Sequence, residues 1–177
     1  MSAGDIFLTC LSASKNVSTL REAKSQEVER IKAIITYQYG PQAAKIFEKA
    51  RVKVEVSKST GRIRKIYVDG ELFGSIRASD GFILPSISGA LKLIKVLPPL
   101  SYQVIIKEDA VVFVARGRSV FCKHVKGCDD RIKAGDEVIV VAEKGELVAV
   151  GRAVISCREM KQKSIGVCVK IRKGKKS

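Results

Sequence analysis

The dipeptide Pro98-Pro99 divides this chain into two parts with different sequence patterns. Prolines lack the amide donor and disfavour helical backbone in the residue before them, so no helix or central strand can run through this point. The 177 residues are enough for one domain or two small ones, but not for a large multidomain enzyme. We therefore predict a lead-in segment at 1–17, an α+β domain at 18–98 and a second domain at 99–177.

The first part begins with a helical pattern. Thr19 and Glu22 have the spacing of a capping box, and apolar residues then recur every three to four positions, which predicts a helix over 20–37. Gly40 should end this helix, and Pro41 suits the first position of a second one.

A small antiparallel sheet is expected next, because apolar and polar residues alternate from Val52 onward. Asp69-Gly70 is a strong signal for a tight hairpin turn. A further helix is expected at 88–94. The predicted strands cover 52–57, 63–68, 72–76 and 82–84.

The part after the prolines consists of short apolar segments separated by glycines, as expected for a small, strongly curved β-barrel. The segment 110–115 fits both a strand and a helical face. The fold class of the whole chain is therefore α+β. The predicted strands of the second part cover 102–106, 120–125, 137–142, 147–155 and 166–171.

The charge balance indicates the type of partner. Lys and Arg number 33 against 18 Asp and Glu, a formal net charge of +15. A field of this sign favours a polyanion, and nucleic acid is the leading candidate. No apolar run is long enough to span a membrane, and the acidic start does not resemble a secretory signal, so we expect a cytoplasmic protein.

The sequence offers no set of residues for catalysis or metal binding. The five cysteines are irregularly spaced, none forms a CxxC pair, and His124 is the only histidine. We therefore expect free, mostly buried thiols, no metal and no small-molecule cofactor. Adjacent carboxylates such as Asp136-Glu137 are interpreted as turn or helix-start residues, and no catalytic residue is predicted.

Basic side chains near predicted turns are the candidates for phosphate contacts, with ordinary solvated surfaces as the alternative. A glycine between arginines would let the backbone approach a phosphate closely. The basic tail could make non-specific contacts or only aid solubility. Since no aromatic residue follows Phe121, the second domain is expected to recognise backbone and shape rather than stacked bases. The candidates are Arg62, Arg64, Lys65 and Arg77 in the first part, and Arg116, Gly117, Arg118, Ser119, Lys123, His124, Lys170, Arg172 and Lys173 in the second.

Two sets of short segments are characteristic. In the second part they are Tyr102–Ile106, Arg116–Val125, Gly135–Val138 and Val148–Ala153, and through them residues 102–172 resemble a PUA domain, an RNA-binding module. In the first part they are Tyr37–Gly40, Thr60–Arg64 and Arg77–Gly81, and through them this part resembles the domain that precedes PUA in archaeal tRNA-guanine transglycosylase and archaeosine synthase.

The resemblance implies a curved β pseudo-barrel with a short helix after its first strand, which would make 110–115 a helix. It also implies an RNA surface formed by 116–124 together with Lys170 and Arg172, which in similar domains grips the acceptor stem and 3′ end of tRNA. The catalytic barrel of the transglycosylase, with its paired aspartates and zinc ligands, has no counterpart here, nor does the catalytic cysteine motif of the synthase.

Two functions remain open. The chain resembles the non-catalytic, PUA-bearing subunit of a split archaeosine tRNA-guanine transglycosylase, whose partners would be tRNA and a separate catalytic chain. The alternative is a free-standing PUA protein that acts on ribosomal RNA in ribosome assembly or translation.

Overall fold

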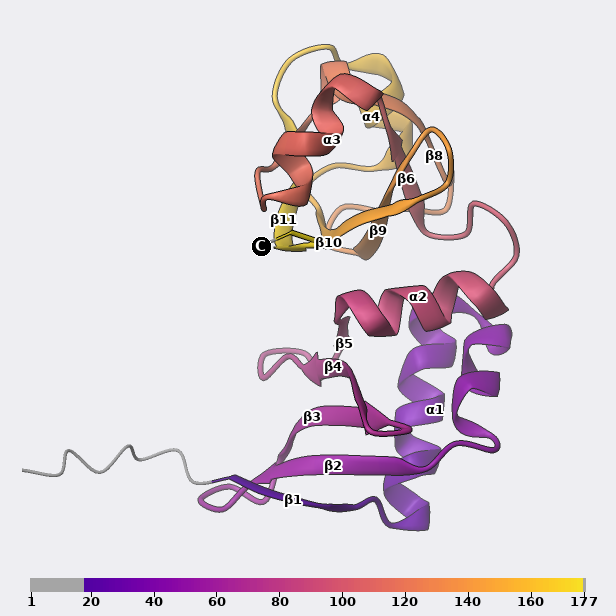
Figure 1. Cartoon of the computed structure of the whole chain (residues 1–177), viewed down its shortest axis with the longest axis vertical. Helices are drawn as coiled ribbons and strands as arrows, with labels where there is room; N and C mark the ends of the chain where they lie inside the picture. Colours follow the sequence, from indigo (N-terminus) through magenta and orange to yellow (C-terminus); the bar gives the residue numbers. More distant parts are fainter. Residues whose placement is uncertain (1–17, 177) are drawn as a thin grey trace, which may run out of the picture.

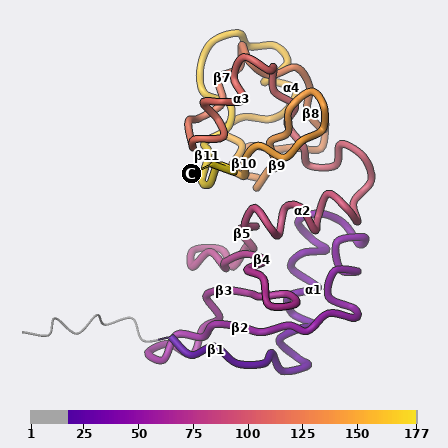
Figure 2. Tube along the Cα trace, viewed as in Figure 1, coloured from indigo at the N-terminus to yellow at the C-terminus, as the bar shows by residue number. Residues whose placement is uncertain are grey.

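The computed structural model describes residues 18–176, so the predicted lead-in segment at 1–17 lies outside the described residues. The chain forms two sheets, one on each side of the prolines (Figure 1). The first has the strand order β1-β2-β3-β4-β5, and the second has the order β7-β11-β10-β9-β6-β8. Helix α2 lies between them, and the chain passes from one part to the other through the segment that follows this helix (Figure 2).

The first part is an antiparallel meander with helices on one side. Its strands are β1 (Ser18–Glu22), β2 (Val52–Ser57), β3 (Ile63–Val68), β4 (Glu71–Ile76) and β5 (Ile83–Pro85). Its helices are α1 (Ser25–Tyr39), a 3₁₀ helix at Pro41–Phe47 and α2 (Ile87–Val96). The predicted Asp69-Gly70 hairpin is confirmed, with both residues at positive φ (53° and 85°), as a tight two-residue turn requires.

The predicted capping box at Thr19 and Glu22 is wrong. These residues belong to the edge strand β1, which pairs antiparallel with β2. Helix α1 begins at Ser25, where the Glu27 carboxylate accepts a hydrogen bond from the Lys24 backbone amide at 2.8 Å. Ladder hydrogen bonds to β2 thus prevail over a local capping signal that is only four residues long. The second predicted helix is present, but as a 3₁₀ helix.

The second part is a nearly closed barrel of mixed strands, which confirms the predicted α+β class with a C-terminal pseudo-barrel. Helix α3 confirms the implied helix at 110–115, whereas α4 was not predicted. The segment 120–125 divides into β7, a 3₁₀ turn and the start of β8. The elements are β6 (Gln103–Ile106), α3 (Glu108–Ala115), β7 (Val120–Phe121), a 3₁₀ helix (Cys122–His124), β8 (Val125–Cys128), β9 (Glu137–Ala142), β10 (Leu147–Ala153), α4 (Cys157–Gln162) and β11 (Val167–Gly174).

The expectation that the cysteines are all free thiols is wrong. Cys128 at the end of β8 and Cys157 at the start of α4 form a disulfide across a separation of 29 residues. Irregular spacing along the chain gave no sign of this pairing, because the barrel brings the two residues together. Cys122 and Cys168 are free and buried, and burial raises the pKa of the Cys168 thiol to about 12.

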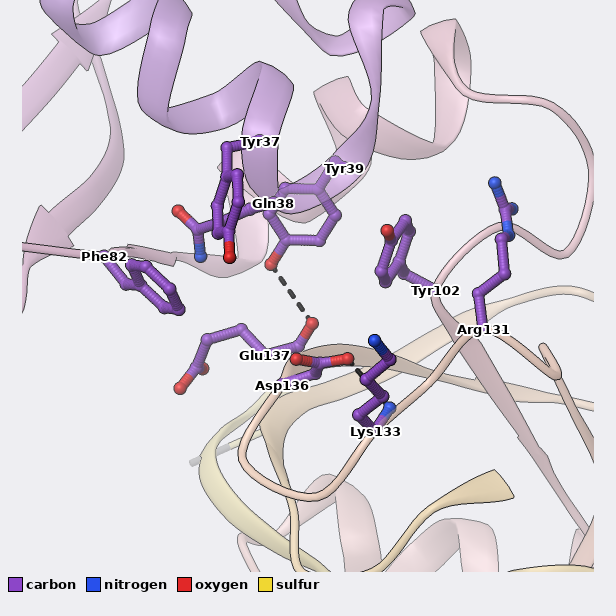
Figure 3. A pocket seen from close by; sticks show the side chains of 9 residues that line it. All are labelled: Tyr37, Gln38, Tyr39, Phe82, Tyr102, Arg131, Lys133, Asp136 and Glu137. Atoms are coloured by element: carbon purple, nitrogen blue, oxygen red, sulfur yellow. Dashed lines mark hydrogen bonds between the residues drawn. The ribbon is translucent and has the colours of Figure 1, made fainter. Parts of the chain in front are cut away.

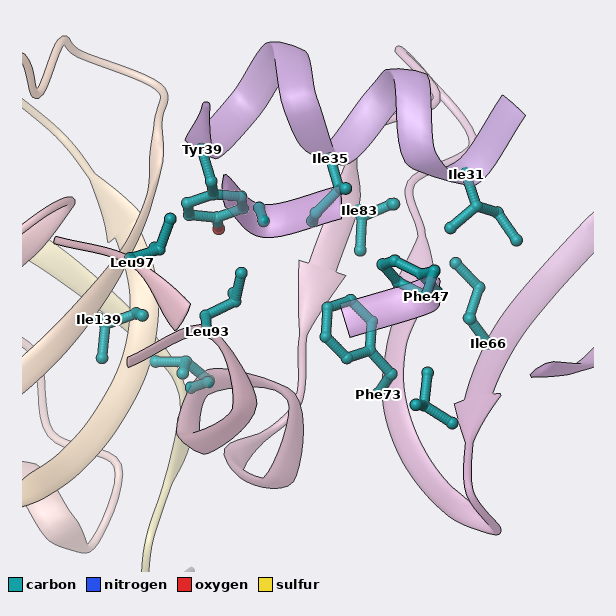
Figure 4. Close-up of a cluster of buried hydrophobic side chains, with 14 of the residues drawn as sticks. Ile31, Ile35, Tyr39, Phe47, Ile66, Phe73, Ile83, Leu93, Leu97 and Ile139 are labelled. Atoms are coloured by element: carbon teal, nitrogen blue, oxygen red, sulfur yellow. The ribbon is translucent and has the colours of Figure 1, made fainter. Parts of the chain in front are cut away.

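One hydrophobic core connects the two parts of the chain (Figure 4). It runs from Ile31 and Ile35 of α1, through Leu93 of α2 and Leu97, to Ile139 of β9. A second cluster fills the barrel itself. The two parts therefore share buried apolar surface instead of meeting only at a linker.

Candidate RNA interface

A groove lies between α1, the β2–β3 turn and the β4–β5 turn, and it has a volume of about 660 Å³. We call it the arginine groove, because four guanidinium groups line it. They belong to Arg30, Arg62, Arg64 and Arg77, of which the last three were predicted as phosphate contacts. The structure thus brings together side chains from three separate segments of the chain.

The arginines of the groove differ in whether a carboxylate lies close to them. Within residues 18–176, no carboxylate lies within ion-pair distance of Arg30 or Arg62, and both side chains are exposed. Arg77 is paired with Asp80 at 2.9 Å. The groove's other carboxylate, Glu27, is held by Arg21 at 2.7 Å, and this hydrogen bond lowers the pKa of Glu27 to about 2. The groove therefore keeps excess positive charge for an anionic ligand.

Two glycines leave the backbone open to a ligand along the arginine groove. Gly61 and Gly81 sit in the β2–β3 and β4–β5 turns at positive φ, 66° and 77°. No other heavy atom lies within 4 Å of where a β carbon would be at either position. A phosphate could therefore approach the backbone closely at both turns.

Lys65 lies outside this groove. Its ammonium group is 2.9 Å from the Glu55 carboxylate, which also accepts hydrogen bonds from Ser18 and Tyr67. These contacts, with the Ser18 bond the largest, lower the pKa of Glu55. Lys65 therefore forms a local ion pair and does not line the groove together with Arg62 and Arg64.

A second group of basic residues surrounds β7 of the barrel. Arg116, Gly117, Arg118 and Ser119 connect α3 to β7, and Gly117 has φ +91°. Lys123 and His124 follow in the 3₁₀ turn, where His124 Nδ1 is 3.4 Å from Asp109 Oδ1. Strand β11 pairs with β7 through Val169 and Val120, which places Lys170 next to this segment. We call the exposed set Arg116, Arg118, Lys123 and Lys170 the PUA basic surface.

Aromatic side chains are exposed in the second domain, although sequence reasoning gave them little weight. The side chain of Phe113 on α3 is 61% exposed, and that of Phe121 on β7 is 46% exposed. Arg118 donates its backbone N–H to the Phe113 carbonyl, so Phe113 lies close to the PUA basic surface. Phe121 lies two residues before Lys123 in the chain. Two exposed rings are therefore available for stacking on bases in this domain, and the expectation that it recognises backbone and shape stays a prediction.

Arg77 and Arg172 meet at the junction between the two parts of the chain. Both guanidinium groups contact the carboxylate of Glu137, which is only 5% exposed. Arg172 also donates to the Pro85 carbonyl at 2.7 Å. Burial raises the pKa of Glu137, while the two arginines oppose this shift. Glu137 begins strand β9, so its interpretation as a turn or helix-start residue is wrong.

Sequence reasoning missed Arg30 and Glu137. Arg30 lies on a helix, and no local pattern tells which exposed helix face will lie beside a β-turn 30 to 50 residues away. Glu137 follows Gly135-Asp136, a turn-like context that conceals a buried counter-ion. The remaining predicted residue, Lys173, is exposed on β11 opposite Val150 of β10.

Among residues 18–176, no group of three or more His, Cys, Asp or Glu side chains could hold a metal ion. Over the same range, no helix is long and apolar enough to cross a membrane.

Two protein-family models match the chain, one in each of its two parts. Residues 29–99 match the patch-forming domain C2 of tRNA-guanine transglycosylase, and residues 102–175 match the PUA domain. The chain therefore carries a C2 domain followed by a PUA domain, the order that the resemblance implied.

Among curated proteins, the chain is 36% identical over 153 residues to the tRNA-guanine(15) transglycosylase of Methanothermobacter thermautotrophicus. It is 38% identical over 162 residues to that of Pyrococcus abyssi. These matches cover 86% and 92% of this chain, but it spans only about a quarter of those relatives (23% and 27%). A hypothetical protein from the archaeon Pyrococcus horikoshii has a similar structure, with a TM-score of 0.73 and 25% identity over 90% of this chain and 96% of that one. The chain is thus similar to one region of the transglycosylases, and the predicted archaeal character agrees with these sources.

Proposed function

We propose that this chain binds tRNA and serves as the non-catalytic, PUA-bearing subunit of a split archaeosine tRNA-guanine transglycosylase. The observation that carries the proposal is the placement of two basic surfaces, the arginine groove in the C2 domain and the PUA basic surface, on parts that share one core. The relatives that match 86% and 92% of this chain act on tRNA guanine, as their names state. Their remaining three quarters would correspond to a separate catalytic chain.

The proposed role is to hold and orient the RNA. Guanidinium groups that bind phosphate in a bidentate way fix the register of a nucleic acid without reading its sequence. Each neutralised phosphate releases counterions, so affinity should fall steeply with salt. The PUA basic surface would contact the acceptor end of tRNA, and the arginine groove would contact the backbone of another arm. Base exchange would take place on the partner chain.

Binding measurements across a series of salt concentrations test the RNA surface. The R118A/K123A variant should weaken tRNA binding and reduce the slope of log K against log [salt] by about one unit per lost phosphate contact. R158A is the matched control, because Arg158 is exposed on α4 and has no carboxylate partner within residues 18–176. An unchanged slope in R118A/K123A would remove the PUA basic surface from the interface.

Two further experiments test the RNA and the partner. Removing the 3′ end of the tRNA should weaken binding, and equal affinity for intact and trimmed tRNA would refute the acceptor-end contact. Adding the chain to a catalytic transglycosylase chain from the same cells should increase incorporation of labelled guanine into tRNA. Crosslinking in those cells distinguishes the alternative, since recovery of ribosomal RNA instead of tRNA would contradict the proposal.

A further inference from the structure

A second cavity, of about 400 Å³, lies at the junction of the two domains, next to the arginine groove (Figure 3). Four of the chain's ten Tyr and Phe residues line it: Tyr37, Tyr39, Phe82 and Tyr102. Figure 3 shows Tyr37 and Tyr39 on the α1 side, facing Lys133 and Asp136 on the barrel side. We call this cavity the aromatic pocket.

Two of these rings have structural roles, and two remain open to a ligand. Tyr39 is buried, and its hydroxyl donates to the Glu137 carbonyl at 3.3 Å. The Arg131 guanidinium covers Tyr102, with 5.3 Å between Cζ and the ring centroid. In contrast, Tyr37 is 78% exposed, and its ring centroid lies 5.9 Å from that of Phe82 at an interplanar angle of 52°. These two rings form an open wedge at the mouth of the pocket.

Charged and polar groups face this wedge from the barrel. Within residues 18–176, no carboxylate lies within ion-pair distance of the Lys133 ammonium group, and the side chain is exposed. The Asp136 carboxylate accepts the Lys133 backbone N–H at 2.8 Å, which leaves it further acceptor capacity. An apolar wedge, a cation and an acceptor are the groups that recognise a base together with its phosphate.

The aromatic pocket continues directly from the arginine groove. Arg30, Ile34 and Tyr37 are spaced i, i+4 and i+7, so they share one face of α1, and Arg30 and Tyr37 are about 10 Å apart along its axis. The first two line the groove and the third lines the pocket. On the other side, Arg77 to Gly81 line the groove, and the next residue, Phe82, lines the pocket. One polynucleotide strand can therefore occupy both.

We propose that the aromatic pocket holds a single unpaired nucleotide of the RNA strand whose phosphates lie in the arginine groove. The base stacks on Tyr37 and Phe82, its N–H edge faces Asp136, and Lys133 contacts the adjoining phosphate. This inference rests on the proposed RNA binding and adds to it a preference for an extruded base, which phosphate contacts alone do not supply.

The test compares two RNA duplexes of equal charge, one fully paired and one with a single-nucleotide bulge. The wild-type protein should bind the bulged duplex about 5- to 160-fold more tightly, the range expected for one base stacked on aromatic side chains. The Y37A variant should lose this preference while keeping the salt slope, and Y37F should retain it. Because Tyr37 is largely exposed, Y37A should fold normally. L91A is the matched control, since Leu91 is 45% exposed on α2 and does not line the pocket.

The outcomes separate this inference from the proposed function. If Y37A keeps the wild-type preference, or the wild type shows none, the aromatic pocket does not hold a nucleotide. The proposed function still stands in that case, provided that R30A/R62A lowers the salt slope relative to the exposed control K45A. If R30A/R62A and R118A/K123A both bind tRNA like the wild type, the proposed RNA surface itself is refuted.

Discussion

Replacing Glu137 with alanine should destabilise the protein more than the loss of a surface charge would. The change leaves the guanidinium groups of Arg77 and Arg172 facing each other without the carboxylate that both contact. Removing one partner of a fully buried ion pair costs about 3–5 kcal/mol. Here the two arginine side chains are 17% and 33% exposed, and they keep Asp80 and the Pro85 carbonyl as partners, so we expect about 2–3 kcal/mol.

Calorimetry provides the measurement. In a domain pair of this size, 1 kcal/mol corresponds to about 2–4 °C, so the midpoint of unfolding of E137A should fall by about 4–12 °C. E143A is the control, because Glu143 forms a surface pair with Lys126 and should change stability by no more than about 0.5 kcal/mol. If E137A melts within 2 °C of the wild type, Glu137 does not hold the domain junction together.

The pH dependence of stability tests separately whether Glu137 is buried in the folded protein. Burial raises the folded-state pKa of Glu137 above its ordinary value of 4.5, so the folded protein binds the proton more tightly than the unfolded chain. The stabilising contribution of Glu137 is therefore fully present below pH 4.5, and it decreases as the pH rises through the raised pKa. E137Q, which cannot ionise, should lack this decrease. A steeper decline of stability with pH in E137Q would contradict the assignment.

Three further changes test other parts of the fold. G89A should lower the free energy of unfolding by about 3 kcal/mol in a denaturant titration, because the added β carbon would overlap the backbone of β4; a neutral effect would mean that α2 packs differently. Reduction of the Cys128–Cys157 disulfide, which closes a loop of 29 residues, should cost about 3.6 kcal/mol, and the C128S/C157S variant should melt at the same temperature with and without reductant. In the wild type, the Glu27 pKa of about 2 implies stability that is present above 4.5 and lost as pH falls toward 2. In R21A the loss between pH 5 and pH 3 should be smaller, and an equal loss in both proteins would show that Arg21 does not hold this carboxylate.

The strands were predictable wherever local pattern and tertiary packing agree. The alternation at 52–57 and the apolar run at 137–142 match β2 and β9, and the Asp69-Gly70 turn fixes the β3–β4 register. The prediction failed at 19–22, where a helix-start signal competes with pairing to β2. The energy of that pairing comes from residues more than 30 positions away, which a local pattern does not contain.

Most arginines of the candidate site were predicted from the sequence, but the way in which they come together was not. Arg62, Arg64 and Arg77 meet in one groove, although Arg62 precedes β3 and a shift in the β2–β3 register falls next to Arg64. Regular strand alternation, which would place residues 62 and 64 on one face, therefore does not explain why they meet. The groove forms because two turns converge on α1, and this convergence depends on the core packing of the whole first domain.

Glu137 also determines which arginines are available to bind phosphate. Arg77 contacts both Asp80 and Glu137, so a phosphate would have to compete with two carboxylates for its guanidinium group. Arg172 is tied to Glu137 and to a backbone carbonyl. These two arginines therefore orient the domains, while Arg30 and Arg62 retain their charge for the ligand. The same carboxylate contacts one arginine of the C2 domain and one of the PUA domain, so it links the domains that carry the arginine groove and the PUA basic surface. An RNA that contacts both then pays the entropy of association once, which makes the second contact effectively intramolecular.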